Sequence, residues 1–250
     1  MTGKWVDGTV LAQDDKCDIK TDMTHQPLLI AIDGTAASGK GTLARILAEK
    51  LDLACLDTGK LYRYVGWQVL QSGGDPGDAR AAIQTAKTMK DHLKLSLLSN
   101  PALQSDEAGQ AASKVGAVPE VRAALLDFQK DFAVNPPLLA GGKAAKGAIL
   151  DGRDIGTVVC PQADVKLFID ANIEIRAQRR MKELQSKGLS VTYEAVLEDM
   201  RQRDARDADR PAAPMKPAQD AAVLDTGRMT IEEVVETALT IIRSKTGIHI

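Results

Sequence analysis

The sequence predicts an α/β protein built around a doubly wound parallel sheet of five strands. Five short apolar runs end in glycine or aspartate: "PLLIAIDG" at Gly34, "LACLD" at Asp57, "GAILD" at Asp151, "VKLFID" at Asp170 and "AVLD" at Asp225. Runs of this kind are typical of buried parallel strands, and helical patterns lie between them, as crossover connections require. In such a sheet ligands bind at the carboxyl ends of the strands, where these aspartates would lie.

Two of the predicted helices follow directly from the sequence pattern. After Gly34, apolar residues recur three and four positions apart, which is the period of a helix packed on a sheet. They are Leu43, Ile46, Leu47 and Leu51. The last helix is predicted to begin at "TIEE", where Thr230 and Glu233 form a capping box ahead of an apolar stripe.

The composition is that of an ordinary folded protein and excludes several classes of function. The 250 residues are 44% hydrophobic and 26% charged, with a formal net charge of −2. This charge gives no general attraction to nucleic acids or acidic membranes, so we expect neither as a partner. No apolar run approaches the roughly 18 residues of a membrane span, and the N-terminus lacks the pattern of a secretion signal.

The cysteines agree with a reducing compartment. Cys17, Cys55 and Cys160 lie far apart and form no C-x-x-C pair. The spacing therefore suggests neither a disulfide framework nor a zinc site, and we expect a cytoplasmic protein.

The pattern also divides the chain. Residues 1–26 are mostly polar without a sustained period, and we interpret them as a disordered N-terminal extension. Residues 27–250 are predicted to form a single domain. Within it, the strand and helix pattern loosens over about 73–137, which predicts an inserted subdomain.

The most specific motif is "GTAASGKGT", between the first strand and the first helix. Gly34 and Gly39 permit backbone angles that turn consecutive N–H groups inward, and the positive end of the helix points to the same place. Such a loop binds phosphate, and Lys40 would reach the β- and γ-phosphates of a nucleotide. Because Gly41 occupies the usual Ser/Thr position, the hydroxyl that could bind Mg²⁺ is that of Thr42.

A nucleoside triphosphate site is compatible with several functions. A GTPase switch would carry an N-K-x-D motif after the loop, and the sequence has none. A motor or transport ATPase would show a long apolar strand ending in an Asp-Glu pair, which is also missing. A phosphotransferase remains, and an anionic acceptor would require arginines at a second site.

Five segments of the chain resemble a single kinase family. They are "IAIDGTAASGKGTLA", "LDTGKLYR", "ASKVGAVPEVRAALLDFQKDFA", "LDGRDIGTVVCPQADVKLFI" and "RQRDARDADRPAAPMKPAQDAAVLDTG". In these segments, which follow the family's order from about residue 28 onward, the chain resembles the bacterial cytidylate kinases, a group of nucleoside monophosphate kinases among the P-loop proteins. "GKGT" occurs in many monophosphate kinases, whereas "DGRDIGTVV" with "RDARDADR" is specific to this family.

The resemblance implies a P-loop kinase fold with a small monophosphate-binding insertion and a helical lid at about 174–192. It also implies transfer of a phosphoryl group from ATP to CMP or dCMP, with Mg²⁺ as cofactor and a monomeric enzyme. The implied ATP-binding residues are Gly34, Thr35, Ala36, Ala37, Ser38, Gly39, Lys40, Gly41, Thr42 and Arg179. The implied CMP-binding residues are Thr58, Arg63, Ser113, Arg122, Arg153, Asp154, Arg203, Asp207 and Arg210.

Roles within these sets are also implied by the resemblance. Catalysis would depend on Lys40, Arg153, Asp154 and Arg203. Ser113 and Arg122 would read the cytosine edge, while the remaining acceptor residues would surround phosphate and sugar. The lid would carry Arg176, Arg179 and Arg180.

The chain departs from the family pattern at three places. Thr35 stands where proline is common, Lys60 stands where a small residue is usual, and the segment before Ser113 is short. Two alternatives therefore remain open. One is a P-loop kinase for AMP, UMP or a metabolite hydroxyl, and the other is a nucleotide-dependent switch module.

The stretch "RQRDARDADR", residues 201–210, divides into two faces at helical spacing. An apolar stripe from Val196 and Met200 continues into Arg203, Asp207 and Arg210, so this face is predicted to point inward. The other face is predicted to be exposed to solvent. It consists of Arg201, Ala205, Ala208 and Asp209.

Overall fold

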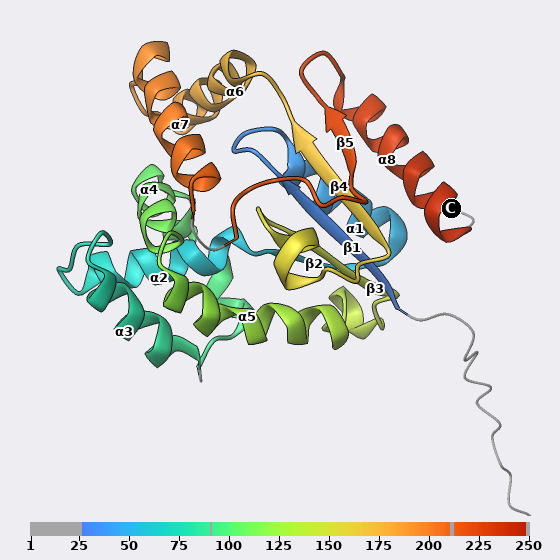
Figure 1. The fold of residues 1–250 in the computed structure, drawn as a ribbon, viewed down its shortest axis with the longest axis horizontal. Coiled ribbons are helices and arrows are strands. Elements are labelled where there is room, and N and C mark those ends of the chain that lie inside the picture. The colour runs from blue at the N-terminus through green and yellow to red at the C-terminus, as the bar shows by residue number, and fades with distance from the viewer. Residues whose placement is uncertain (1–26, 91, 211–212, 249–250) are drawn as a thin grey trace, which may run out of the picture.

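The computed structural model describes residues 27–90, 92–210 and 213–248 (Figure 1). The disorder predicted for residues 1–26 therefore concerns a segment outside the described residues. The described residues form a central sheet with helices on both faces.

The sheet confirms the predicted α/β class. Its strands are β1 (Leu28–Gly34), β2 (Ala54–Asp57), β3 (Gly147–Asp151), β4 (Val165–Asp170) and β5 (Ala222–Asp225). All four pairings are parallel, and the strand order is β2-β3-β1-β4-β5. Each predicted apolar run forms one strand and ends at the same edge of the sheet.

The two faces of the sheet bury separate apolar clusters. In β1, Ile30 and Ile32 point to one face, where α1 (Lys40–Leu51) and α8 (Ile231–Thr246) cover the sheet. Ala31 points to the other face, which α2 (Gly59–Gln71) and α5 (Pro119–Val134) cover. This alternation follows from the two-residue period of a strand and makes both faces of the sheet core. The predicted capping box at Thr230 and Glu233 begins α8.

The region predicted as an insertion is helical. Between residues 73 and 137 the chain forms α3 (Ala79–Lys90), two short 3₁₀ helices, η1 (Leu95–Ser99) and η2 (Pro101–Gln104), α4 (Asp106–Val115) and α5. α4 packs closely on α2, where a Cβ on Gly66 would lie 2.7 Å from the Ala111 Cβ. α5 packs on the sheet, so the region shares its core with the body of the domain.

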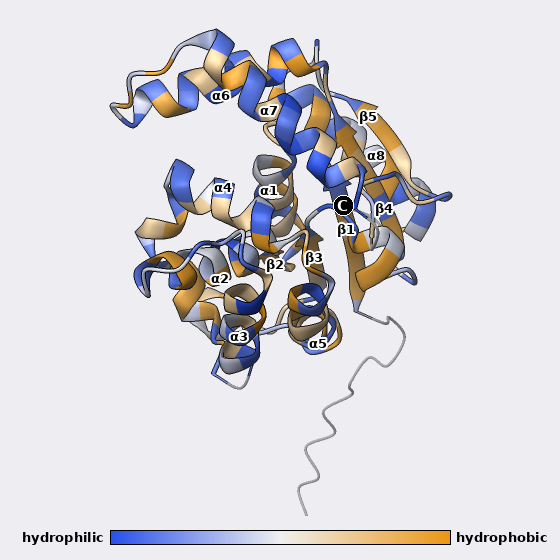
Figure 2. Ribbon diagram, turned by 60° about the vertical axis from the view of Figure 1, so that its left-hand side comes forward, coloured by the Kyte–Doolittle hydropathy of each residue, from blue (hydrophilic) through white to orange (hydrophobic). Residues whose placement is uncertain are grey.

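Two helices stand apart from the sheet. α6 (Ile173–Ser186) and α7 (Tyr193–Ala208) pack against each other, and Figure 2 shows them across from α2 and α4. They enclose a small third apolar cluster that Ala36 of the phosphate loop joins. The residues predicted as the lid, about 174–192, correspond to α6 and the turn that follows it.

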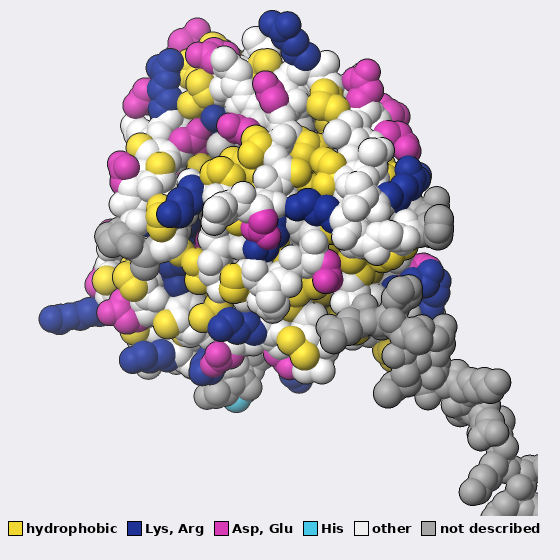
Figure 3. Space-filling view, turned by 45° about the vertical axis from the view of Figure 1, so that its right-hand side comes forward, with side chains coloured by type: hydrophobic (Ala, Val, Ile, Leu, Met, Phe, Trp, Pro, Cys, Tyr) yellow, Lys and Arg dark blue, Asp and Glu magenta, His cyan; other side chains and the backbone are white. Residues whose placement is uncertain are grey.

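Two short helical segments complete the fold, η3 (Ala140–Gly142) and the π-helical turn η4 (Ile155–Val159). Within the described ranges, no helix combines the length and apolar character needed to cross a membrane. On the face shown in Figure 3, lysine and arginine side chains are interspersed with aspartate and glutamate.

Candidate active site

A cavity of about 850 Å³ opens at the carboxyl edge of the sheet. The phosphate loop forms its floor, and α2, α4, the loop after β3 and the inner face of α7 form its walls. Every residue predicted for the CMP site lines it. From the phosphate loop, the lining residues are Ala36, Ala37, Gly39, Lys40, Gly41 and Thr42.

The phosphate loop has the backbone that the sequence predicts. Gly39 has a φ of 94° directly before α1, and Gly34 has a φ of 144°. A Cβ on Gly34 would lie 1.9 Å from the Ile169 carbonyl oxygen, so only glycine fits there. The hydroxyl of Thr35 donates to Asp170 Oδ1 over 2.8 Å and ties the loop to the end of β4. A threonine in place of the usual proline thus gives the loop a side-chain tether.

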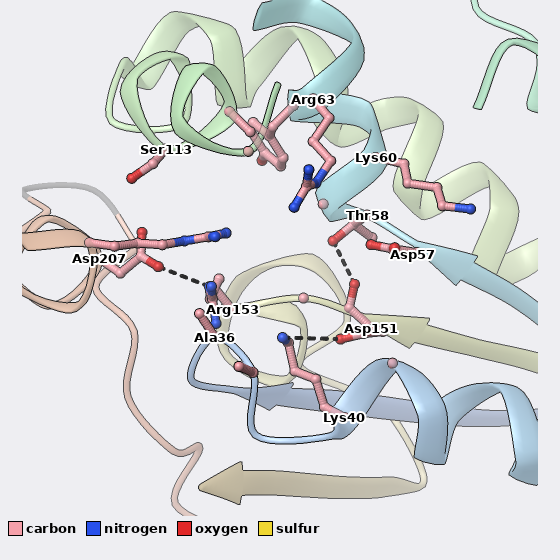
Figure 4. A pocket seen from close by; sticks show the side chains of 18 of the residues that line it. Ala36, Lys40, Asp57, Thr58, Lys60, Arg63, Ser113, Asp151, Arg153 and Asp207 are labelled. Carbon is pink, nitrogen blue, oxygen red and sulfur yellow. Dashed lines mark hydrogen bonds and ion pairs between the residues drawn. The ribbon is translucent and has the colours of Figure 1, made fainter. Parts of the chain in front are cut away.

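Lys40 lies between the donor loop and the acceptor side. Its Nζ is 3.4 Å from the Thr35 carbonyl oxygen and 4.0 Å from Asp151 Oδ1 (Figure 4). Burial, together with the positive charge of Arg153, lowers the pKa of Lys40. Burial raises the pKa of Asp151, although Lys40 opposes that shift. The ammonium group is thus held in a poorly solvated place, where its interaction with a phosphate is strongest.

Asp33 is a buried carboxylate beneath the site. Its two oxygens accept hydrogen bonds from the backbone N–H groups of Ile155 (2.7 Å) and Gly156 (2.8 Å). Burial raises its pKa to about 6, against the two N–H donors, which lower it. These bonds fix the start of η4 and, with it, the preceding residues Arg153 and Asp154.

Three guanidinium groups surround a single carboxylate on the acceptor side. Arg153 Nε lies 2.9 Å from Asp207 Oδ2, and Arg210 pairs with the other oxygen of Asp207. Arg203 Nε is buried without a hydrogen-bond partner among the described residues. Burial, followed by the charge of Arg153, lowers the Arg203 pKa to about 9. With one carboxylate against three arginines, this corner attracts an anion.

A second pair lies deeper in the acceptor side. Arg122 pairs with Asp154, and its guanidinium stacks 5.3 Å from the centre of the Tyr62 ring. Asp154 lines the same cavity as Asp207, and its own ion-pair partner is Arg122. Ser113 is 3% exposed and points into the cavity.

The comparisons with known proteins agree with this geometry. The sequence profile described as "Cytidylate kinase" matches residues 30–244. The chain belongs to the cytidylate kinase family. A cytidylate kinase of Rhodospirillum rubrum is 57% identical over 218 residues, covering 87% of this chain and 98% of the relative. One of Paramagnetospirillum magneticum is 56% identical over 217 residues, covering 87% and 98%, and one of a Caulobacter species is 48% identical over 216 residues, covering 86% and 94%.

In this member of the cytidylate kinase family, two predicted acceptor residues also donate hydrogen bonds to the backbone. Thr58 donates its hydroxyl to the Asp151 carbonyl oxygen over 2.8 Å and precedes α2. Arg63 donates to the carbonyl oxygens of Leu103 (2.9 Å) and Ser105 (3.1 Å). Both side chains still line the cavity. Lys60 points away from the Asp207 cluster in Figure 4.

The three predicted lid arginines occupy different environments. Arg176 is buried, outside the cavity lining, and donates to the Ala36 carbonyl oxygen (3.3 Å) and to Asp204 (2.6 Å). Arg179 lines the cavity and donates to Thr226, and Arg180 lines it and pairs with Asp106 at 2.6 Å. Arg176 thus supports the phosphate loop from behind.

The interpretation of "RQRDARDADR" is confirmed with one correction. Arg203 is half-buried and Asp207 is buried, whereas the predicted outer face is exposed. Arg210 is buried as well, but α7 ends at Ala208, so Arg210 approaches Asp207 from beyond the helix. The prediction missed Arg206, whose guanidinium donates hydrogen bonds to Ser113 and Gln110 of α4.

Other site residues also escaped sequence reasoning. The sequence pattern places Asp57 and Asp151 at strand ends on the ligand-binding edge but gives them no individual role, and the parallel register sets them side by side. Tyr62 went unnoticed because a single aromatic residue in a helix carries no signal of stacking.

Proposed function

We propose that this protein transfers the γ-phosphoryl group of ATP to CMP or dCMP, giving ADP and CDP or dCDP. One observation carries the proposal: a single cavity contains both the phosphate loop with Lys40 and the arginine cluster around Asp207. A kinase needs both sites in one enclosure because donor and acceptor react in line.

The donor side supplies positioning and charge. The loop amides and the N-terminus of α1 would hold the β- and γ-phosphates, and the Lys40 ammonium would offset the negative charge on the phosphoryl group in transfer. No protein base is required, since phosphoryl transfer of this type depends mainly on position and electrostatics.

The acceptor side suits a monophosphate. A phosphate that carries nearly two negative charges would lie among three guanidinium groups. Arg203 Nε has no hydrogen-bond partner among the described residues, and the guanidiniums of Arg153 and Arg210 pair with Asp207. Hydrogen bonds of this charged kind contribute about 1.5–3 kcal/mol each. Bonds of this strength are enough to select a phosphorylated acceptor over one that carries no phosphate.

The pair of Arg122 and Asp154 suits cytosine. Cytosine presents an amino donor beside two acceptors, N3 and O2, and a guanidinium next to a carboxylate presents the complementary order. Uracil would place its N3–H against the arginine donors. AMP, UMP and unphosphorylated metabolites are therefore the weaker acceptors.

The residues present fit Mg²⁺ held largely through the substrate. No group of three metal-ligating side chains exists in the described ranges. Thr42 lines the cavity, and Asp151 Oδ1 is buried without a hydrogen-bond partner. Mg²⁺ commonly takes one or two protein ligands with phosphates and waters, so Thr42 and Asp151 would hold it. When bound, it would neutralise phosphate charge during transfer.

The adenine of ATP would bind beside the phosphate loop. A second cavity of about 480 Å³ lies between the start of α6 and the loop after β5. Thr226 in that loop donates to the Ser38 carbonyl oxygen over 2.8 Å, so this cavity adjoins the phosphate loop. We assign the donor base to it.

We also place the enzyme in the cytoplasm, where the free thiols Cys55 and Cys160 would stay reduced, and expect a monomer. Sedimentation at several concentrations would test the monomer.

A coupled assay of ADP formation with CMP, dCMP, UMP and AMP tests the function. We expect the cytosine nucleotides to exceed UMP and AMP in kcat/KM by about 100-fold or more, and EDTA to abolish activity. A preference for AMP or UMP would show a kinase for another acceptor. Nucleotide hydrolysis that does not respond to CMP would favour a switch module.

A further inference from the structure

Arg206 connects two walls of the acceptor site without lining the cavity. It lies on α7 directly before Asp207 and is half-buried. Its Nε donates to Ser113 Oγ over 3.1 Å, and its second terminal nitrogen donates to Gln110 Oε1 over 3.4 Å. Both partners belong to α4 and both line the cavity.

The bond from Arg206 fixes where the Ser113 hydroxyl lies. A serine hydroxyl has one donor hydrogen and two acceptor positions. Arg206 occupies one acceptor position, which leaves the O–H and one lone pair of Ser113 for the cavity. The hydroxyl is thus held in one place before any nucleotide arrives.

The position of Arg206 also links base and phosphate recognition. Arg203 and Asp207, three residues before it and one after it, belong to the predicted phosphate cluster on the same helix. Any shift of α7 that moves Asp207 must also move the partner of Ser113. Pre-organised polar groups of this kind favour the ligand whose hydrogen bonds they match.

We propose that Arg206 is a positioning residue for base selection, holding Ser113 and Gln110 so that the site prefers a cytosine over a uracil monophosphate. The inference rests on the proposed function, because it concerns the acceptor of that reaction. Arg206 itself does not contact the substrate.

Arg206→Met tests the idea, because it removes every donor while retaining a long apolar stem. We expect the KM for CMP to rise about tenfold and the KM for UMP to change less, so that the CMP/UMP ratio of kcat/KM falls. The KM for ATP should stay within about twofold. Arg206→Lys, which retains a donor and the charge, should recover part of the preference. Arg201→Met removes the same charge from the exposed face of α7 and should match the wild type.

A double-mutant cycle with Ser113→Ala separates positioning from general support. If Arg206 acts through Ser113, the Arg206→Met, Ser113→Ala double variant should be no worse with CMP than Ser113→Ala alone. Additive losses would overturn the inference. So would an unchanged CMP/UMP ratio in a folded Arg206→Met protein, with folding checked by thermal unfolding. A wild type that does not phosphorylate CMP would instead overturn the proposed function, and the inference with it.

Discussion

Arg153 and Asp207 form an ion pair, with Nε 2.9 Å from Oδ2, that joins the loop after β3 to α7 across the acceptor cavity. The guanidinium of Arg153 also donates to the carbonyl oxygen of Gly34, the first residue of the phosphate loop. A single side chain therefore touches the donor loop and the acceptor cluster. Substitutions on the donor side of this pair should change mainly the kinetics with ATP, and substitutions on the acceptor side should change mainly the KM for CMP.

Lys40→Met should lower kcat by about 100-fold or more, because the ammonium stabilises the charge that moves during transfer. The KM for CMP should change little, since Lys40 belongs to the phosphate loop and is not part of the arginine cluster around Asp207. Steady-state kinetics with both substrates varied would measure this. Lys50→Met, on the exposed end of α1, is the matched control. A Lys40→Met enzyme with normal kcat would refute the assigned role.

Arg203→Gln should raise the KM for CMP by about tenfold to 100-fold, with a smaller effect on ATP. The reason is that Arg203 Nε has no partner among the described residues and lies beside the Asp207 cluster. Initial rates over a range of CMP concentrations would test it, with Arg201→Gln as control. Equal losses for ATP and CMP would contradict a role confined to the acceptor.

Asp33→Asn should change how stability depends on pH. Burial raises the Asp33 pKa from 3.8 to about 6, so the folded state binds this proton more tightly than the unfolded state. The resulting stabilisation is fully present below pH 3.8 and is lost as pH rises through about 6. The wild type should therefore lose about 3 kcal/mol relative to Asp33→Asn across this window. Urea unfolding at several pH values would measure the difference, and parallel curves would contradict it.

Gly66→Ala should destabilise the fold by about 1–3 kcal/mol, because the new methyl group would overlap α4. It would lie 2.7 Å from Ala111 Cβ and 2.9 Å from the Ala111 carbonyl carbon. Adding Ala111→Gly should recover part of the loss by removing the first contact. The free energy of unfolding tests both variants, and a Gly66→Ala protein as stable as the wild type would show that the helices separate easily.

The fold could be predicted well from local pattern because each strand is a short apolar run with a polar end. The strand order could not, since pairing of β1 with β3 and β4 depends on contacts between distant segments. The site shows the same limit. The inward face of Arg203 and Asp207 follows from helical spacing, but the pairing of Arg122 with Asp154 joins residues 32 positions apart. Arg206 was missed because its partners lie on another helix.

The third apolar cluster gives the α6–α7 hairpin a degree of independence. Ala177, Leu184, Val196 and Met200 pack together with Ala36 and Ala37 of the phosphate loop, while the sheet rests on two larger clusters of its own. We therefore expect the hairpin to open locally, once its polar contacts to the rest of the site break, without melting the sheet. Substitutions in this cluster would alter how often the site opens, and so the rate of product release, while leaving the global unfolding midpoint nearly unchanged.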